Sequence, residues 1–144
     1  MKLELFRLTS NHLYTQGKLL VNGGQFSNSV EHTFSMLPIG EYQVKLQKIT
    51  KSHKKMVIIP VAQACPAPSS SSPQPSIDQG NSWKDALANN SIVIGRHHAA
   101  GCVIKSPEAY NLLFNRMKKS KTPITLIITD LHCKEDKPNA HWLK

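Results

Sequence analysis

The chain has 144 residues, which favours a single domain, and its hydrophobic fraction of 40% lies outside the disordered class. No run of about 18 apolar residues occurs, so we expect no membrane-spanning helix. Lysine and arginine outnumber aspartate and glutamate 18 to 9, which indicates a polyanionic partner such as an acidic wall polymer. Nucleic acid is not expected, because the aromatic residues (6%) are not interleaved with the basic runs.

The amino-terminal sequence MKLELFRLTSNHLY alternates polar and apolar residues and lacks the apolar core of a signal peptide. This predicts a cytoplasmic protein, or one that reaches the periplasm or exterior by lysis or through a secretion apparatus. The cysteines Cys65, Cys102 and Cys133 are odd in number, which favours free thiols over a disulfide framework. No CxxC motif is present, so a zinc ribbon is not expected. Oligomeric state is left open.

The first third of the chain predicts β-structure. Residues 2–9 alternate as a half-buried strand does, and TQGKLLVNGGQFSNSVEHTF predicts a hairpin with a turn at Asn-Gly-Gly. LPIGEYQVKLQKIT begins with a turn at Pro38 and Gly40 and continues as a strand. MVIIPVAQA follows as a short covered strand whose proline places it at an edge or an end.

The middle of the chain changes composition. Residues 65–81 are rich in proline and serine and are predicted to be a flexible insertion in one β-rich domain, 1–130. SWKDALANN is compatible with a short helix capped by Ser82. Residues 131–144 are predicted to be a polar tail.

The last third predicts a strand at SIVIG (91–95), a loop HHAAGC, one clear helix and a final strand TPITLIITD. We expect the helix to be capped by Ser106, with Pro107 in its first position. A core stripe is expected at Ala109, Leu112, Leu113 and Met117. The predicted fold is therefore mostly β, sandwich- or barrel-like, with one helix in the carboxyl-terminal half packed on it (α+β).

The segment RHHAAGCVIK contains the most reactive side chains. A thiol attacks as its thiolate, which a neighbouring imidazolium or backbone N–H group favours. Cys102 is therefore a candidate nucleophile, with His97 or His98 as its base. The remaining candidates are expected to form an oxyanion hole or bind substrate: Gly101, Val103, Arg96 and Lys105.

This segment resembles the catalytic segment of L,D-transpeptidases: a strand ending in glycine, then small-Gly-Cys-Val, then a helix. Most of residues 3–129 are also similar to a small bacterial and phage-associated domain family of unknown function. GKLLVNG, SVEHTF, LPIGEYQV and the Gly-Cys segment carry this similarity. The resemblance implies a β-rich cysteine enzyme without a cofactor that acts on peptidoglycan stem peptides by acyl transfer.

Four residues depart from the transpeptidase pattern. Ala99-Ala100 stand in place of Ser-His, Ile94 in place of a histidine, and Ile104 in place of an arginine. The chain is therefore expected to be an enzyme of this type or a degenerate relative of it. The alternative is a non-catalytic binding or structural module on the same scaffold, associated with a phage or with secretion.

Simpler interpretations remain open for each candidate. Cys102 is equally compatible with a small buried hydrophobic residue, and the two histidines with an exposed loop pair. Metal binding by these three residues is not expected, because the set lacks a carboxylate or a second cysteine at a recognised spacing, and His132, Cys133 and His141 in the tail would capture a metal only fortuitously. Glu31 and His32 match an acidic position of the similar family, yet a lone glutamate on a hairpin is usually solvated.

Overall fold

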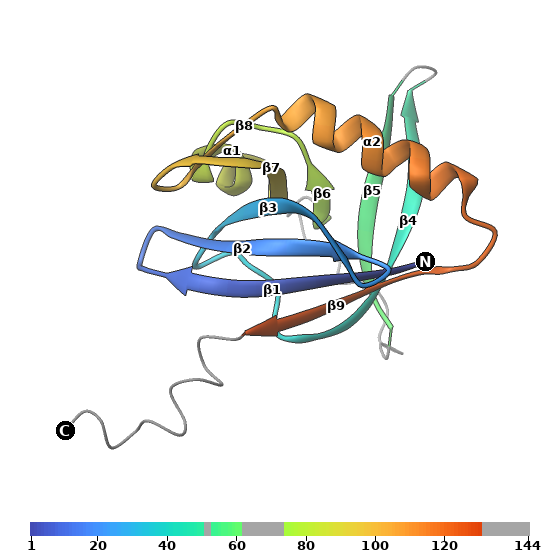
Figure 1. Ribbon diagram of the computed structural model, residues 1–144, viewed down its shortest axis with the longest axis horizontal. Helices are drawn as coiled ribbons and strands as arrows, with labels where there is room; N and C mark the ends of the chain where they lie inside the picture. The colour runs from blue at the N-terminus through green and yellow to red at the C-terminus, as the bar shows by residue number, and fades with distance from the viewer. Residues whose placement is uncertain (51–52, 62–73, 131–144) are drawn as a thin grey trace.

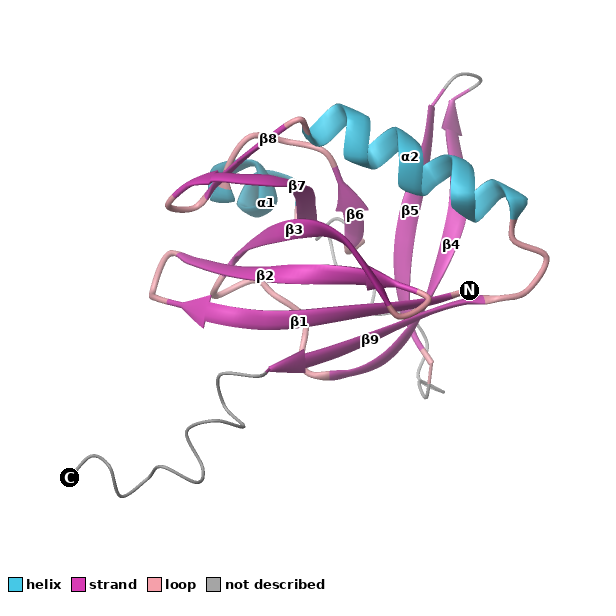
Figure 2. Ribbon diagram, viewed as in Figure 1, coloured by secondary structure: helices cyan, strands magenta, loops and turns pink. Residues whose placement is uncertain are grey.

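The structure, a computed structural model, describes residues 1–50, 53–61 and 74–130. Eight strands of this part of the chain form one sheet that closes on itself as a barrel, and two helices pack against it (Figures 1 and 2). The fold is therefore mostly β, which confirms the predicted fold class.

The described residues form nine strands and two helices. In chain order they are β1 (Lys2–Ser10), β2 (Tyr14–Val21), β3 (Gly24–His32), β4 (Gly40–Thr50), β5 (His53–Pro60), β6 (Ser76–Asp78), α1 (Trp83–Asn89), β7 (Ser91–Ala99), β8 (Cys102–Ile104), α2 (Ser106–Lys119) and β9 (Ile124–Asp130). The predicted β2–β3 hairpin turns at Asn22 and Gly23, both with positive φ (49° and 89°), the backbone of a tight Asn-Gly turn.

The sheet order is β3-β2-β1-β9-β4-β5-β6-β7-β8. β9 inserts between β1 and β4, parallel to β1 and antiparallel to β4. A short antiparallel pairing of β3 with β7, from Asn28↔Gly95 to Val30↔Val93, closes the ring. β8 lies outside the ring, paired only with β7 among the named strands.

Alternate residues of each strand point into the barrel and form the core. Leu3 and Leu5 of β1, Leu126 and Ile128 of β9 and Ile94 of β7 are all at most 1% exposed. A second, smaller cluster lies outside the ring, where α1 and β8 cover β3 and β7: Val30, Ala86, Val93 and Val103. This second cluster holds the segment that contains Cys102 against the barrel.

Helix α1 begins as the sequence predicts. The Ser82 hydroxyl accepts from the Lys84 N–H, and the Asp85 carboxylate accepts from the Ser82 N–H, which completes a capping box. Neither helix of the described residues is long and apolar enough to cross a membrane.

Helix α2 departs from the sequence analysis at its start and along its face. Ser106 is its first residue, not its cap: the cap position is Lys105, which has a left-handed backbone (φ 56°) and no capping hydrogen bond. The Ser106 hydroxyl is instead buried, accepting from the Gly80 N–H and donating to the Ile94 carbonyl. Tyr110, Leu113 and Met117 form the buried stripe, while Leu112 is 59% exposed.

Two segments that were predicted to be loops contain strands in the structure. β7 does not end at Gly95 but continues through both histidines to Ala99, so the expected HHAAGC loop is a hairpin. Within the predicted insertion, residues 76–78 form β6, and Ile77 is completely buried in the core. The insertion is thus shorter at its carboxyl end. Residues 62–73 and the predicted tail 131–144 lie outside the described residues.

Candidate functional site

The Gly-Cys segment is a bulged hairpin made of β7 and β8. His97 pairs with Val103 and Ala99 pairs with Cys102, so His98 is the extra residue of a β-bulge. His98 and Ala99 together oppose Cys102 in this bulge. Strand alternation places His97 and Val103 on the other face of the hairpin. Of the two histidines, His98 is therefore the one opposite the thiol.

The two imidazoles have different surroundings. Nδ1 of His97 lies 2.9 Å from Nε2 of Gln16, and the His97 backbone N–H donates to the Asn28 side chain at 3.1 Å. The hairpin is thereby tied across β3 to β2. His98 is exposed. Within the described residues, Cys102 is half-buried and makes no hydrogen bond with either imidazole.

Gly101 adopts a positive φ of 71°, as its role in a tight turn requires. A Cβ atom there would lie 2.8 Å from Cδ1 of Trp83 and 2.9 Å from Cδ2 of Tyr14. The space beside Gly101 is thus taken by two aromatic rings of the chain itself. The prediction that a substrate approaches closely at Gly101 is not met in this conformation.

The candidate oxyanion donors are also partly engaged. The Val103 N–H donates to the Asn81 carbonyl at 2.9 Å, and the Gly101 carbonyl accepts from the Trp83 N–H at 2.9 Å. These bonds join the hairpin to the start of α1. The Val103 N–H is therefore not free to donate to an oxyanion in this conformation. Arg96 and Lys105 are both exposed, at the hairpin and at the start of α2.

A groove of about 270 Å³ lies beside the hairpin. It is lined by Leu8, Thr9, Gln16, Gly17, Asn28, Ser29, His97 and Val103, and not by Cys102. Its lining includes the apolar side chains of Leu8 and Val103 and the side-chain amides of Gln16 and Asn28. The sequence analysis identified His97 and Val103 here but missed the residues of β1, β2 and β3, because only barrel closure brings these strands to the hairpin.

The interior of the barrel contains a buried ion pair that the sequence analysis did not predict. Nε and Nη2 of Arg7 donate to the two carboxylate oxygens of Glu31 at 3.0 and 2.8 Å, and Nη2 also donates to the Leu37 carbonyl. Glu31 is 1% exposed, so the expectation of a solvated glutamate is wrong. Burial raises the pKa of the Glu31 carboxyl above its ordinary value, while the hydrogen bond and charge of Arg7 act in the opposite direction. The signal available in the sequence was the alternation Leu3, Leu5, Arg7, which places Arg7 on the inner face.

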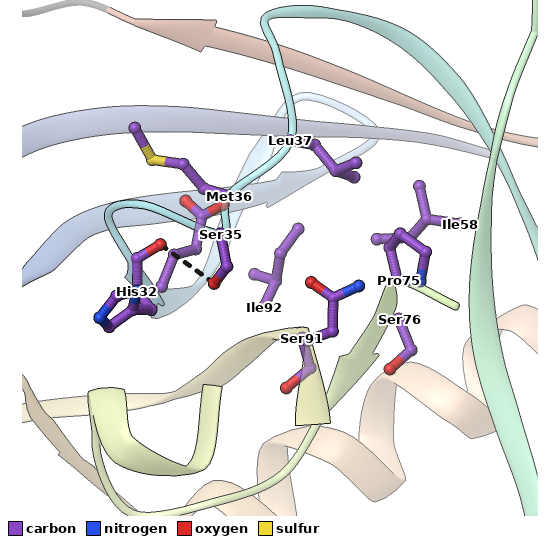
Figure 3. A pocket seen from close by; sticks show the side chains of 11 residues that line it. His32, Ser35, Met36, Leu37, Ile58, Pro75, Ser76, Ser91 and Ile92 are labelled. Atoms are coloured by element: carbon purple, nitrogen blue, oxygen red, sulfur yellow. Dashed lines mark hydrogen bonds between the residues drawn. The ribbon is translucent and has the colours of Figure 1, made fainter. Parts of the chain in front are cut away.

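Next to this ion pair lies a small pocket between the 33–39 connection and strands β5, β6 and β7 (Figure 3). Ile58 and Pro75 form one side, and His32 and Ser35, which are joined by a hydrogen bond, form the other. Its cavity of about 10 Å³ has room for about one water molecule. It is therefore too small for a substrate in this conformation.

No three His, Cys, Asp or Glu side chains of the described residues lie close enough together to hold a metal ion. This applies to His97, His98 and Cys102. The tail residues His132, Cys133 and His141 lie outside the described part of the chain.

No match is found among family models, curated proteins or solved structures.

Proposed function

We propose that this chain is a non-catalytic binding module whose groove beside the β7–β8 hairpin takes an extended peptide of the peptidoglycan stem type. The observation that carries the proposal is the groove itself: about 270 Å³, close to the size of small-ligand sites, with polar side chains beside the apolar side chains of Leu8 and Val103.

The chemistry of the lining suits a peptide. Each peptide group offers one donor and one acceptor, and the amides of Gln16 and Asn28 supply both kinds of partner. Leu8 and Val103 supply apolar contact for small side chains such as alanine. The resemblance to L,D-transpeptidases supports the same class of ligand, which requires delivery of the protein to the cell wall.

Titration calorimetry with a stem tetrapeptide tests the proposal. Gln16→Ala should lower the affinity about tenfold, because it removes a polar partner in the groove and the contact that fixes His97. Gln47→Ala, an exposed glutamine on β4, is the matched control and should bind as the parent does. Absence of binding by the parent, or equal loss in both variants, would refute the groove as the site.

The second candidate function is cysteine-dependent acyl transfer to the same peptides. One observation favours it: the bulge sets His98 opposite Cys102 in the hairpin. In this mechanism the thiolate attacks a peptide carbonyl, His98 receives the thiol proton and returns it to the leaving amine, and an amine or water resolves the thioester.

The two functions are distinguished in a Cys65→Ser/Cys133→Ser background, where Cys102 is the remaining thiol. Acyl transfer predicts a covalent adduct with the tetrapeptide by mass spectrometry and alkylation of Cys102 that slows in His98→Ala but not in His97→Ala. Binding without an adduct, with equal alkylation in all variants, supports the module. An adduct that His98→Ala abolishes would replace it by the enzyme.

A further inference from the structure

Among the residues whose exposure the structure describes, five exposed cations gather at one end of the molecule, away from the groove. This basic end consists of Lys45 on β4, Arg116, Lys118 and Lys119 on the last turn of α2, and Lys121 in the connection to β9. Register brings these segments together: Val44 pairs with Ile124, so Lys45 lies level with the α2–β9 connection. Figure 1 shows the end of α2 and the start of β9 on the same side of the barrel.

The basic end is not neutralised by neighbouring carboxylates. None of the five cations has a described carboxylate within ion-pair distance, whereas Lys2 nearby is balanced by Glu4 at 3.8 Å. Among the described acids, Glu31, Glu41 and Asp130 lie toward the opposite ends of their strands. Uncompensated like charges repel one another, and an anionic partner relieves this repulsion.

The helix dipole explains only part of this arrangement. Cations in the last turn of a helix are favourable there, which accounts for the three residues of α2. It does not account for Lys45, which is on a strand, or for Lys121, which follows the helix. The rings of Phe26 and Phe114 lie under Arg116 and Lys118 at 5.8 and 5.7 Å and hold these two cations in place.

The same features indicate the class of partner. Four of the five cations are lysines, which contact phosphates as point charges and do not read bases by paired hydrogen bonds. The two aromatic rings at this end already carry cations, so the described residues offer no free surface there on which bases stack. The cations also come from three different segments, which a flexible chain can follow more closely than a stiff duplex.

We propose that the basic end binds a flexible phosphate polymer without bases, by contacts to its phosphates. This site is separate from the groove and does not depend on the peptide-binding proposal. About five phosphate contacts to a flexible chain predict an affinity that falls roughly 100-fold between 50 and 200 mM salt.

Inorganic polyphosphate is the probe, with binding measured by calorimetry at several salt concentrations. Lys45→Gln/Lys119→Gln/Lys121→Gln should weaken binding at least about tenfold and flatten the salt dependence, because three contacts are lost. Lys84→Gln/Arg96→Gln/Lys105→Gln changes the net charge equally at exposed positions elsewhere and should bind nearly as the parent does. Circular dichroism melts would establish that both variants are folded.

Equal weakening in the two triple variants would mean that net charge alone attracts the polymer, and the site would be overturned. Tighter binding of a 20-base-pair DNA duplex than of polyphosphate would overturn the class of partner. Loss in the first variant alone, with polyphosphate preferred, supports the proposal.

Discussion

Arg7 and Glu31 form a buried ion pair inside the barrel. Both side chains are buried, and Nη2 of Arg7 bridges the Glu31 carboxylate and the Leu37 carbonyl, each at 2.8 Å. The pair therefore also fixes the connection between β3 and β4, which forms one wall of the small pocket. A buried ion pair adds little net stability, but removal of one partner leaves a costly charge.

Arg7→Met should lower the free energy of unfolding by about 3–5 kcal/mol at neutral pH, because Glu31 is left without its partner. Without Arg7, the hydrogen bond and the charge that oppose the burial-induced rise of the Glu31 pKa are lost. Below the ordinary value of 4.5 the carboxyl is protonated in both the folded and the unfolded state, so the charge penalty is absent. As the pH rises above that value, the Glu31 carboxyl ionises in the unfolded state before it ionises in the folded state. The free energy of unfolding of the variant therefore falls with rising pH until the pH reaches the pKa of the folded carboxyl.

Urea unfolding between pH 4 and 8 measures this dependence. The control is Arg7→Met/Glu31→Leu, in which neither charge remains and no such loss with rising pH should occur. A single variant with the same pH profile as the double variant would contradict the argument.

At the scale of elements, the β7–β8 hairpin is held by its turn and by α1. Its turn residue Gly101 is enclosed by Trp83 and Tyr14, and two backbone hydrogen bonds tie it to the start of α1. The hairpin and α1 therefore form one unit, which keeps His97 over β2 and shapes the groove.

Gly101→Ala should destabilise the protein more than Gly23→Ala does. Both positions have positive φ (71° and 89°), so each alanine incurs a backbone cost of about 1–2 kcal/mol. A Cβ at Gly101 also meets Trp83 at 2.8 Å, whereas a Cβ at Gly23 meets nothing within 4 Å. The difference between the two melting temperatures therefore isolates the packing of the hairpin. Equal losses would show that the aromatic rings move aside freely.

At the scale of the whole molecule, the last described strand completes the barrel begun by the first. β9 pairs with β1 and with β4, so the ring is continuous only when the first and the last described strands meet. Such distant pairings are formed at a high cost in loop-closure entropy, and the buried core of β9 offsets it.

Leu126→Ala should lower the free energy of unfolding by about 2–5 kcal/mol, because its side chain is completely buried between β1 and β4. Leu112→Ala removes the same atoms from a residue that is 59% exposed and should change stability by at most about 0.5 kcal/mol. Chemical denaturation compares them directly. A similar loss in both variants would place Leu112 in a contact that the fold does not show.

The sequence by itself determined the local elements. Period-two alternation indicated β1, the Asn-Gly turn indicated the hairpin of β2 and β3, and Ser82 indicated the start of α1. These features depend on residues only a few positions apart, so their physical cause is complete within a short window.

Only the tertiary structure decided which distant residues meet. The pairing of Arg7 with Glu31, the closure of β3 on β7, and the burial of Ser106 against Ile94 all join segments that no local pattern connects. The same holds for the candidate site: the sequence indicated the histidines and Cys102, but the bulge that sets His98 opposite the thiol and the strands that line the groove come from pairing across the barrel. Periodicity determines which face of a strand is buried, whereas its partner is selected by the packing energy of the whole ring.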